Sequence, residues 1–195
     1  MTGGRVGQLF ASCLVLALGV VLLLRAAAGS DGYSTFVTGL SRSTGWDFAV
    51  GNTLVAVVLV GLAWARGTRP GPGTLVQPLV VGTAVSAGLA VSEEPGSLVV
   101  RALLLVLALP VLAVGVAGYL NTASGAGPAE AAALSFDPPV PFRWGYNALQ
   151  GAGALLGWLG GADVGPGTVL VVLALGPAVD AARARLPRWP DPVVV

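Results

Sequence analysis

The chain contains no histidine and no lysine, and it has a single cysteine. The lack of histidine removes the commonest general base and the commonest metal-ligating side chain. Cys13 stands in an apolar run, so it can build neither a disulfide framework nor a thiolate cluster, and we expect a small buried side chain. No serine paired with a base and no metal-ligand cluster takes their place. The sequence therefore predicts no catalytic residue, no cofactor site and no metal site, and we expect that the protein is not an enzyme.

Charge is also scarce. Charged residues make up 10% of the chain, whereas an ordinary soluble domain carries about 25%. Hydrophobic residues make up 55%, and the mean hydropathy is +0.84. A soluble fold of this composition would expose large apolar patches, so the expected surroundings and partner are a lipid bilayer. The net charge of +1 gives no strong positive field, and we expect no nucleic-acid partner.

Six apolar runs are long enough to cross about 30 Å of hydrocarbon as helices. They are continuous rather than alternating, which favours helices over barrel strands. We place them near Leu9–Ala28, Phe48–Ala65, Gly73–Val91, Leu98–Leu120, Trp144–Gly161 and Val164–Ala182. The predicted fold class is therefore an all-α membrane protein with six transmembrane helices.

The first run also resembles a secretory signal peptide, with an early arginine and a small-residue stretch at Ala26–Ala28. Its apolar centre is long for such a peptide. In addition, three residues in this run or just beside it recur 96 positions later: Arg5, Gly19 and Gly29 match Arg101, Gly115 and Gly125. A leader that is removed has no reason to be one copy of a repeat, so we expect the first run to be retained as a helix.

The repeat extends along most of the chain. A Gly-Pro-Gly-Thr block occurs at 71–74 and again at 165–168, and Asn52 is matched by Asn147. The two copies, 5–92 and 98–184, each hold three apolar runs. An odd number of crossings per copy reverses the orientation of the second, which predicts an inverted-topology repeat. We thus expect one membrane domain over 1–195 that ends in a cytoplasmic tail, 185–195.

The distribution of arginines predicts the orientation in the membrane. With the N-terminus inside, seven arginines lie on the cytoplasmic side and three lie outside, as the positive-inside rule requires. Both termini are then cytoplasmic. Arginine as the sole basic residue, together with abundant Ala, Gly and Val, indicates a bacterial genome of high GC content. The expected location is a bacterial cytoplasmic (plasma) membrane.

Two longer loops occupy matching places after the first run of each copy, at Gly29–Trp46 and Gly125–Phe142. In the second, Pro128 stands where a helix begins and Glu130 falls in the first turn. We predict a short interfacial or re-entrant helix in each loop. A plain surface loop remains the alternative.

Several of these motifs resemble the YczE/YyaS/YitT group of bacterial integral membrane proteins. The resemblance is carried by Gly39-Leu40-Ser41-Arg42 with Thr44-Gly45, and by the two GPGT blocks with the glycines that follow them, Gly82 and Gly176. It covers nearly the whole chain and implies a multipass membrane protein. The activity of that group is largely uncharacterised, so the resemblance implies no substrate.

Polar side chains inside the apolar runs are the candidate site. Buried amides need partners, and Asn52 and Asn147 either bond neighbouring helices or border a polar cavity between the two copies. We predict that the two amides approach each other near the membrane midplane. The other residues assigned to this cavity are Gln77, Gln150, Thr74 and Thr168. For Asp180 the alternatives are an ionisable role, a pairing with Arg183, or plain exposure on the cytoplasmic side.

Gly153, Gly157 and Gly161 recur every fourth residue and predict a stripe of small residues on one helix face. Such a stripe packs either within the chain or between subunits of a homo-oligomer. The GPGT blocks lack the lysine and the long loop of a phosphate-binding motif, which favours a structural role as helix starts.

Two function classes follow. The first is a small secondary-transporter-like permease for an unknown small molecule or ion, which requires a polar cavity between the copies. The alternative is a non-transporting membrane partner or scaffold, which requires a dry interior and an exposed docking face.

Overall fold

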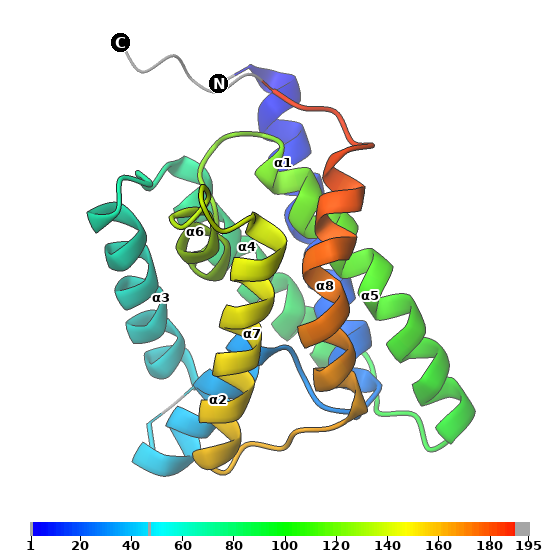
Figure 1. Cartoon of the computed structure of the whole chain (residues 1–195). Helices are drawn as coiled ribbons and strands as arrows, with labels where there is room; N and C mark the ends of the chain where they lie inside the picture. Colours follow the sequence, from blue (N-terminus) through cyan, green and yellow to red (C-terminus); the bar gives the residue numbers. More distant parts are fainter. Residues whose placement is uncertain (1, 47, 190–195) are drawn as a thin grey trace.

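The computed structural model describes residues 2–46 and 48–189, without the side chains of Phe48, Ala49 and Ser86. Within these residues every regular element is an α-helix (Figure 1). The helices are α1 (Gly3–Arg25), α2 (Gly32–Thr44), α3 (Phe48–Ala65), α4 (Pro72–Ala90), α5 (Leu98–Leu120), α6 (Pro128–Leu134), α7 (Phe142–Leu159) and α8 (Pro166–Arg183). The predicted all-helical class is confirmed. The predicted tail is described only as far as Trp189, and the rest of it lies outside the described residues.

Each of the six predicted apolar runs forms a helix, and the two predicted short helices are present as α2 and α6. Four helices, α1, α4, α5 and α8, are both long and apolar enough to cross a membrane. The described apolar part of α3, Val50–Ala65, is shorter, and α7 is interrupted by polar side chains such as Arg143 and Gln150. Four candidate spans are compatible with a membrane protein.

The GPGT blocks are helix starts. Gly71 and Gly165 have extended backbone at the N-cap positions of α4 and α8, and a proline opens each helix. The hydroxyl of Thr74 accepts a hydrogen bond from the Gly71 N–H at 3.1 Å. Thr168 accepts one from Gly165 at 3.5 Å. Proline is suited to this position because its missing N–H would have no helical partner there.

The core is centred on the packing of α1 against α5, which run side by side in Figure 1. Glycines let the two backbones approach closely. A Cβ at Gly19 would lie 2.8 Å from the backbone nitrogen of Leu112, and Gly115 faces Leu16 in the same way. Cys13 is fully buried in this core, as the sequence predicts.

The other helices pack either on this pair or on one another. α4 packs on α1 and α8 packs on α5, whereas α2 packs on α7 and α3 packs on α6. The short helices are therefore each covered by a helix of the other half of the chain. α7 also packs on α8, while α3 and α4 make little contact with each other.

Candidate functional site

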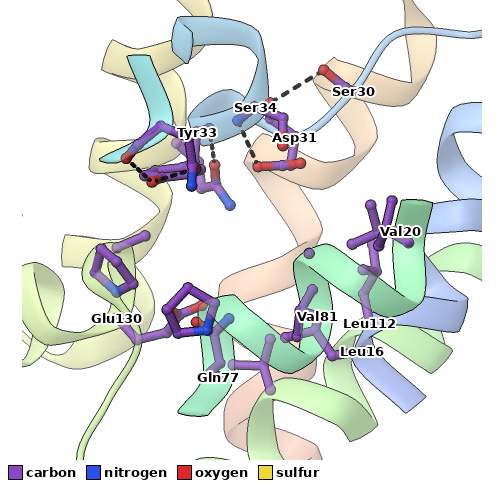
Figure 2. A pocket seen from close by; sticks show the side chains of 18 of the residues that line it. Leu16, Val20, Ser30, Asp31, Tyr33, Ser34, Gln77, Val81, Leu112 and Glu130 are labelled. Carbon is purple, nitrogen blue, oxygen red and sulfur yellow. Dashed lines mark hydrogen bonds between the residues drawn. The ribbon is translucent and has the colours of Figure 1, made fainter. Parts of the chain in front are cut away.

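A cavity of about 620 Å³ lies between the helices, and each of the eight described helices contributes to its lining. Its two sides differ in chemistry. Leu16 and Val20 of α1, Val81 of α4 and Leu112 of α5 gather on one side (Figure 2). The start of α2 and side chains of α3, α6 and α7 bring polar groups to the other. The cavity is thus amphipathic, and its volume suits a small organic molecule.

The first turn of α2 builds part of the polar side. Asp31 caps this helix, and its carboxylate accepts a hydrogen bond from the Ser34 N–H at 3.0 Å. Gln150 of α7 is buried, and its Oε1 accepts from the Tyr33 N–H at 2.9 Å. The Tyr33 hydroxyl in turn donates to Oδ1 of Asn52 on α3 at 2.9 Å. This chain of bonds fixes α2 between α7 and α3 and holds its polar start at the cavity.

Glu130 of α6 is a buried carboxyl in the cavity wall, with 5% of its surface exposed. The Tyr146 hydroxyl donates to its Oε1 at 2.9 Å, and the Tyr119 hydroxyl is a second hydrogen-bonding neighbour. Burial raises the pKa of Glu130, and this effect outweighs the two hydroxyls, which lower it. Asp31 raises the same pKa further. The site therefore favours a carboxyl that carries a proton or meets a cation.

Gln77 of α4 stands beside this carboxyl. Its Oε1 is buried and has no hydrogen-bond partner within the described part of the chain. A Cβ on Gly127 would lie 2.9 Å from this oxygen and 2.7 Å from Oε2 of Glu130. The two oxygens therefore lie close together beside Gly127, and when Glu130 is ionised both can only accept hydrogen bonds from a shared donor.

Three of the residues predicted from the sequence line the cavity: Asn52, Gln77 and Gln150. Thr74 and Thr168 lie instead at the helix starts described above, because their hydroxyls are occupied by the preceding glycine N–H groups. Asp180 lies in the last turns of α8, partly exposed and outside the lining.

Asn147 does not line the cavity either, and it joins α7 to α8. Its Nδ2 donates to the carbonyl of Leu173 at 3.0 Å, and its Oδ1 accepts from the Gly176 N–H at 3.0 Å. Pro177 has no N–H and stands at the position that would bond Leu173, so Asn147 replaces a donor that α8 lacks. The hydrogen bonds of Asn52 and Asn147 therefore go to different elements, and the predicted pairing of the two amides is replaced by separate helix contacts.

The glycine stripe of α7 packs within the chain. A Cβ at Gly153 would lie 2.6 Å from the carbonyl oxygen of Gly32, and Gly157 meets the backbone of Thr35. Gly161 lies beyond the end of α7 with a φ of +88°, so it does not belong to the stripe. The face formed by Gly153 and Gly157 is covered by α2, so of the two predicted alternatives this part of the stripe packs within the chain.

Comparison with known proteins places the chain in a family. The model of the family described as "Family of unknown function (DUF6198)" matches residues 4–184. The chain belongs to this family. A protein of Haemophilus influenzae (strain ATCC 51907 / DSM 11121 / KW20 / Rd), titled "Uncharacterized protein", is 27% identical over 184 residues, which span 90% of this chain and 83% of that protein. No solved structure matches.

Sequence reasoning missed the buried carboxyl in the cavity wall of this DUF6198 member. Glu130 is the one acid within the alanine-rich stretch 128–134, and an isolated charge among small apolar residues was the available signal. Its partners Tyr119 and Tyr146 lie on α5 and α7, so only the packing of three helices brings them together.

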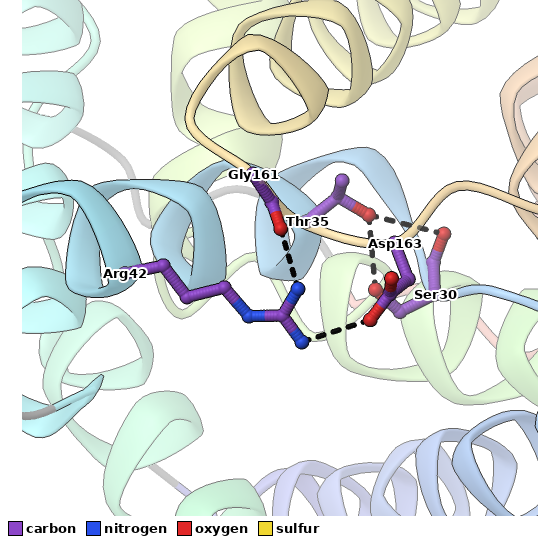
Figure 3. Close-up of polar contacts among 5 residues, drawn as sticks. All are labelled: Ser30, Thr35, Arg42, Gly161 and Asp163. Carbon is purple, nitrogen blue, oxygen red and sulfur yellow. Dashed lines mark hydrogen bonds and ion pairs between the residues drawn. The ribbon is translucent and has the colours of Figure 1, made fainter.

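A second, smaller cavity of about 340 Å³ lies beside Ser30 and Thr35, near the start of α2. Asp163, in the loop between α7 and α8, also lines it. Arg42, in the last turn of α2, bonds the carbonyl of Gly161 and pairs with the Asp163 carboxylate at 2.8 Å (Figure 3). These contacts attach α2 to the loop between α7 and α8. Arg42 lowers the pKa of Asp163 through this hydrogen bond and its charge.

We expect Asp163→Asn to leave the thermal unfolding midpoint nearly unchanged, because both partners are exposed to solvent. A lowered pKa stabilises the fold above the ordinary pKa of the carboxyl, and that contribution is lost as pH falls through the lowered value. Unfolding of the detergent-purified protein at neutral pH measures the effect. Glu94→Gln, which breaks the other exposed pair with Arg101, is the matched control. A drop of several degrees for Asp163→Asn alone would mean that the pair anchors α2.

Proposed function

We propose that this protein is a small secondary-transporter-like permease of a bacterial cytoplasmic membrane, and that it binds a small molecule or ion in the cavity between its helices. The amphipathic cavity is the observation that carries the proposal. Its polar side is formed by the starts of the short helices α2 and α6. Interrupted helices that line a central site are a recurring feature of secondary transporters.

We further propose the architecture of two three-helix repeats in opposite orientation. Two matched contacts support it. The Gly73 N–H at the start of α4 donates to the carbonyl of Ser124 at 2.7 Å, and the Gly167 N–H at the start of α8 donates to Ala28 at 2.7 Å. Each GPGT block thus receives a carbonyl from the segment that follows the first helix of the other half.

The opposite ends of α4 and α8 show a second matched arrangement. Arg25, the last residue of α1, donates hydrogen bonds to the carbonyl of Leu89 in the last turn of α4 and to the carbonyl of Ser92 just beyond its end. Its counterpart 96 positions later is Asn121, whose Nδ2 donates to the carbonyls of Arg183 and Leu186 at 3.0 and 3.2 Å. Equivalent positions therefore satisfy equivalent orphan carbonyls with different side chains, as expected for diverged copies of one unit.

In this proposal α3 and α7 join the four candidate spans, and both termini lie in the cytoplasm as the arginine distribution predicts. Exposed apolar side chains support contact with lipid on α3 and α5, where Val57, Val58 and Leu103 each expose more than half of their surface. The cavity chemistry is that of binding, and the proposal includes neither an enzymatic step nor a cofactor.

We expect that a cysteine at Ser34, which lines the cavity, reacts with a membrane-impermeant methanethiosulfonate from either side of the membrane. A permease exposes its site alternately to both sides. The measurement uses right-side-out and inside-out vesicles with Ser34→Cys in a Cys13→Ala background. Thr122→Cys is the control, because Thr122 is fully buried outside the cavity lining and is expected to stay unlabelled.

Labelling from one side only would indicate a binding site without transport. If Ser34→Cys were unreactive from both sides, the interior would be closed to water, and the scaffold alternative would replace the permease.

A further inference from the structure

Building on the proposed permease function, we propose that the ligand is a monovalent organic cation with an apolar body, and that its protonated amine binds between Glu130 and Gln77 in exchange for a proton. Binding leaves an ammonium–carboxylate pair in the cavity and releases the carboxyl proton of Glu130 to solvent. No covalent bond other than this O–H bond breaks, and the charge of Glu130 is balanced in both states, by the proton or by the ammonium group.

The charge of the lining selects the sign of the ligand. Among the described residues of the cavity wall, two carry carboxyl groups, Asp31 and Glu130, and none is an arginine. Asp31 already accepts a backbone hydrogen bond at the start of α2, whereas Oε2 of Glu130 lies beside Gly127 together with the unpartnered oxygen of Gln77. An anion would meet two carboxyls and no basic partner, so the wall favours a cation.

The unpartnered oxygen of Gln77 selects a donor. Tyr146 donates to Oε1 of Glu130, and the Tyr119 hydroxyl is the second neighbour of this carboxyl. Oε2 of Glu130 and the unpartnered Oε1 of Gln77 both lie next to Gly127. A protonated carboxyl supplies a single donor to this space. An ammonium group supplies three, enough to bond both oxygens at once. A buried acceptor without a donor costs free energy, so the arrangement favours a ligand that brings one.

The rest of the cavity accommodates the apolar body. The wall of Leu16, Val20, Val81 and Leu112 provides a surface that a bare metal ion or a small polar cation would leave uncovered. The volume of about 620 Å³ holds a molecule with an aromatic ring or a short alkyl chain next to the head group.

The groups around Glu130 explain why a proton and the amine exclude each other. Tyr146 faces it from α7 and Tyr119 from α5, with Asp31 and Tyr33 at the start of α2 and Cys13 on α1. All of these are neutral or acidic. α3, which also packs on α6, contains no titratable residue, and Arg66 beyond its end bonds the Ser135 carbonyl at the far end of α6. No built-in cation balances Glu130 among the described residues, so a proton or the ligand must do so.

The test compares three probes that share one apolar body: 2-phenylethylammonium, 2-phenylethanol and 3-phenylpropanoate. Their binding to the full-length protein in lipid nanodiscs is measured by titration calorimetry across a pH series, in buffers of different ionisation enthalpy. We expect the ammonium probe to bind at least about tenfold more tightly than the other two. Its affinity should rise by up to about tenfold per pH unit while Glu130 is protonated, with one proton released per molecule bound.

Variants separate this exchange from a general loss of structure. Glu130→Gln keeps the shape of the side chain, and it should weaken the ammonium probe by about tenfold or more and abolish its pH dependence and proton release. Binding of 2-phenylethanol to Glu130→Gln should be unchanged, which shows that the cavity is intact. Glu94→Gln, whose carboxylate is outside the cavity lining, should behave as the unmodified protein.

Preferential binding of the alcohol or the carboxylate would overturn the proposed ligand class while leaving the cavity as a binding site. Ammonium binding without pH dependence or proton release would overturn the exchange. If no probe binds but Ser34→Cys is labelled from both sides of the membrane, the cation class is wrong and the permease stands. If Ser34→Cys is also unlabelled, the permease proposal itself fails.

Discussion

Gly157→Ala is expected to lower the free energy of unfolding by about 3 kcal/mol, because the added methyl group would overlap the backbone of α2. A Cβ at this position would meet the carbonyl of Thr35 and lie 2.7 Å from the backbone nitrogen of Phe36. In the same contact, a Cβ at Gly39 of α2 would meet the backbone of Gly157. Backbone thus faces backbone here, and neither helix has a flexible side chain that can move aside. The shift is measured by far-UV circular dichroism during unfolding of the detergent-purified protein.

Gly61→Ala in α3 is the matched control. This glycine also lies within a helix, but a Cβ there meets nothing within 4 Å. Alanine has the higher helix propensity, so the substitution should be neutral or should stabilise by up to about 1 kcal/mol. Equal unfolding curves for Gly157→Ala and Gly61→Ala would mean that α2 does not pack on α7 as described.

The helices themselves could be predicted because their signals are local. The apolar runs, the Gly-Pro helix starts and the small residues of the α1–α5 contact each act within one turn or one helix face. The number of spans could not be settled in this way. Arg143, Asn147 and Gln150 make α7 too polar to count as a span by composition, although its other residues are apolar.

The site was only partly predictable, because the roles of its residues depend on helices far apart in the sequence. In the sequence, Asn52 and Asn147 are alike, because each is an amide within an apolar helix. In the structure, Asn52 lies in the cavity wall, whereas Asn147 supplies the donor that Pro177 removes from α8. From the sequence, Glu130 is an acidic residue in the first turn of a short helix, and such residues commonly lie on the surface. Its burial becomes visible only when Tyr119 and Tyr146 are packed around it.

The matched ends of the two halves provide the second large expected effect. Gly29 and Gly125 have φ angles of +97° and +110°, a backbone conformation that residues with a side chain rarely adopt. A Cβ at Gly125 would also lie 2.6 Å from the Thr74 hydroxyl and 2.8 Å from the Gly71 backbone, and one at Gly29 would lie 2.7 Å from the Gly165 nitrogen. Gly29→Ala and Gly125→Ala should each cost about 3 kcal/mol of unfolding free energy, from backbone strain and overlap together.

Gly67→Ala separates the two contributions, because Gly67 has the same φ as Gly29, +97°, but open space where the Cβ would be. Its expected cost is the strain alone, about 1 kcal/mol. If the halves are inverted copies of one unit, the losses at Gly29 and Gly125 should agree to within about 0.5 kcal/mol and exceed that at Gly67. A large loss at only one of the two would show that the GPGT contacts are not equivalent, and would remove a main support for the inverted repeat. Equal losses would instead tie the stability of each half to the segment it receives from the other, since each glycine belongs to one half and the threonine it contacts belongs to its counterpart.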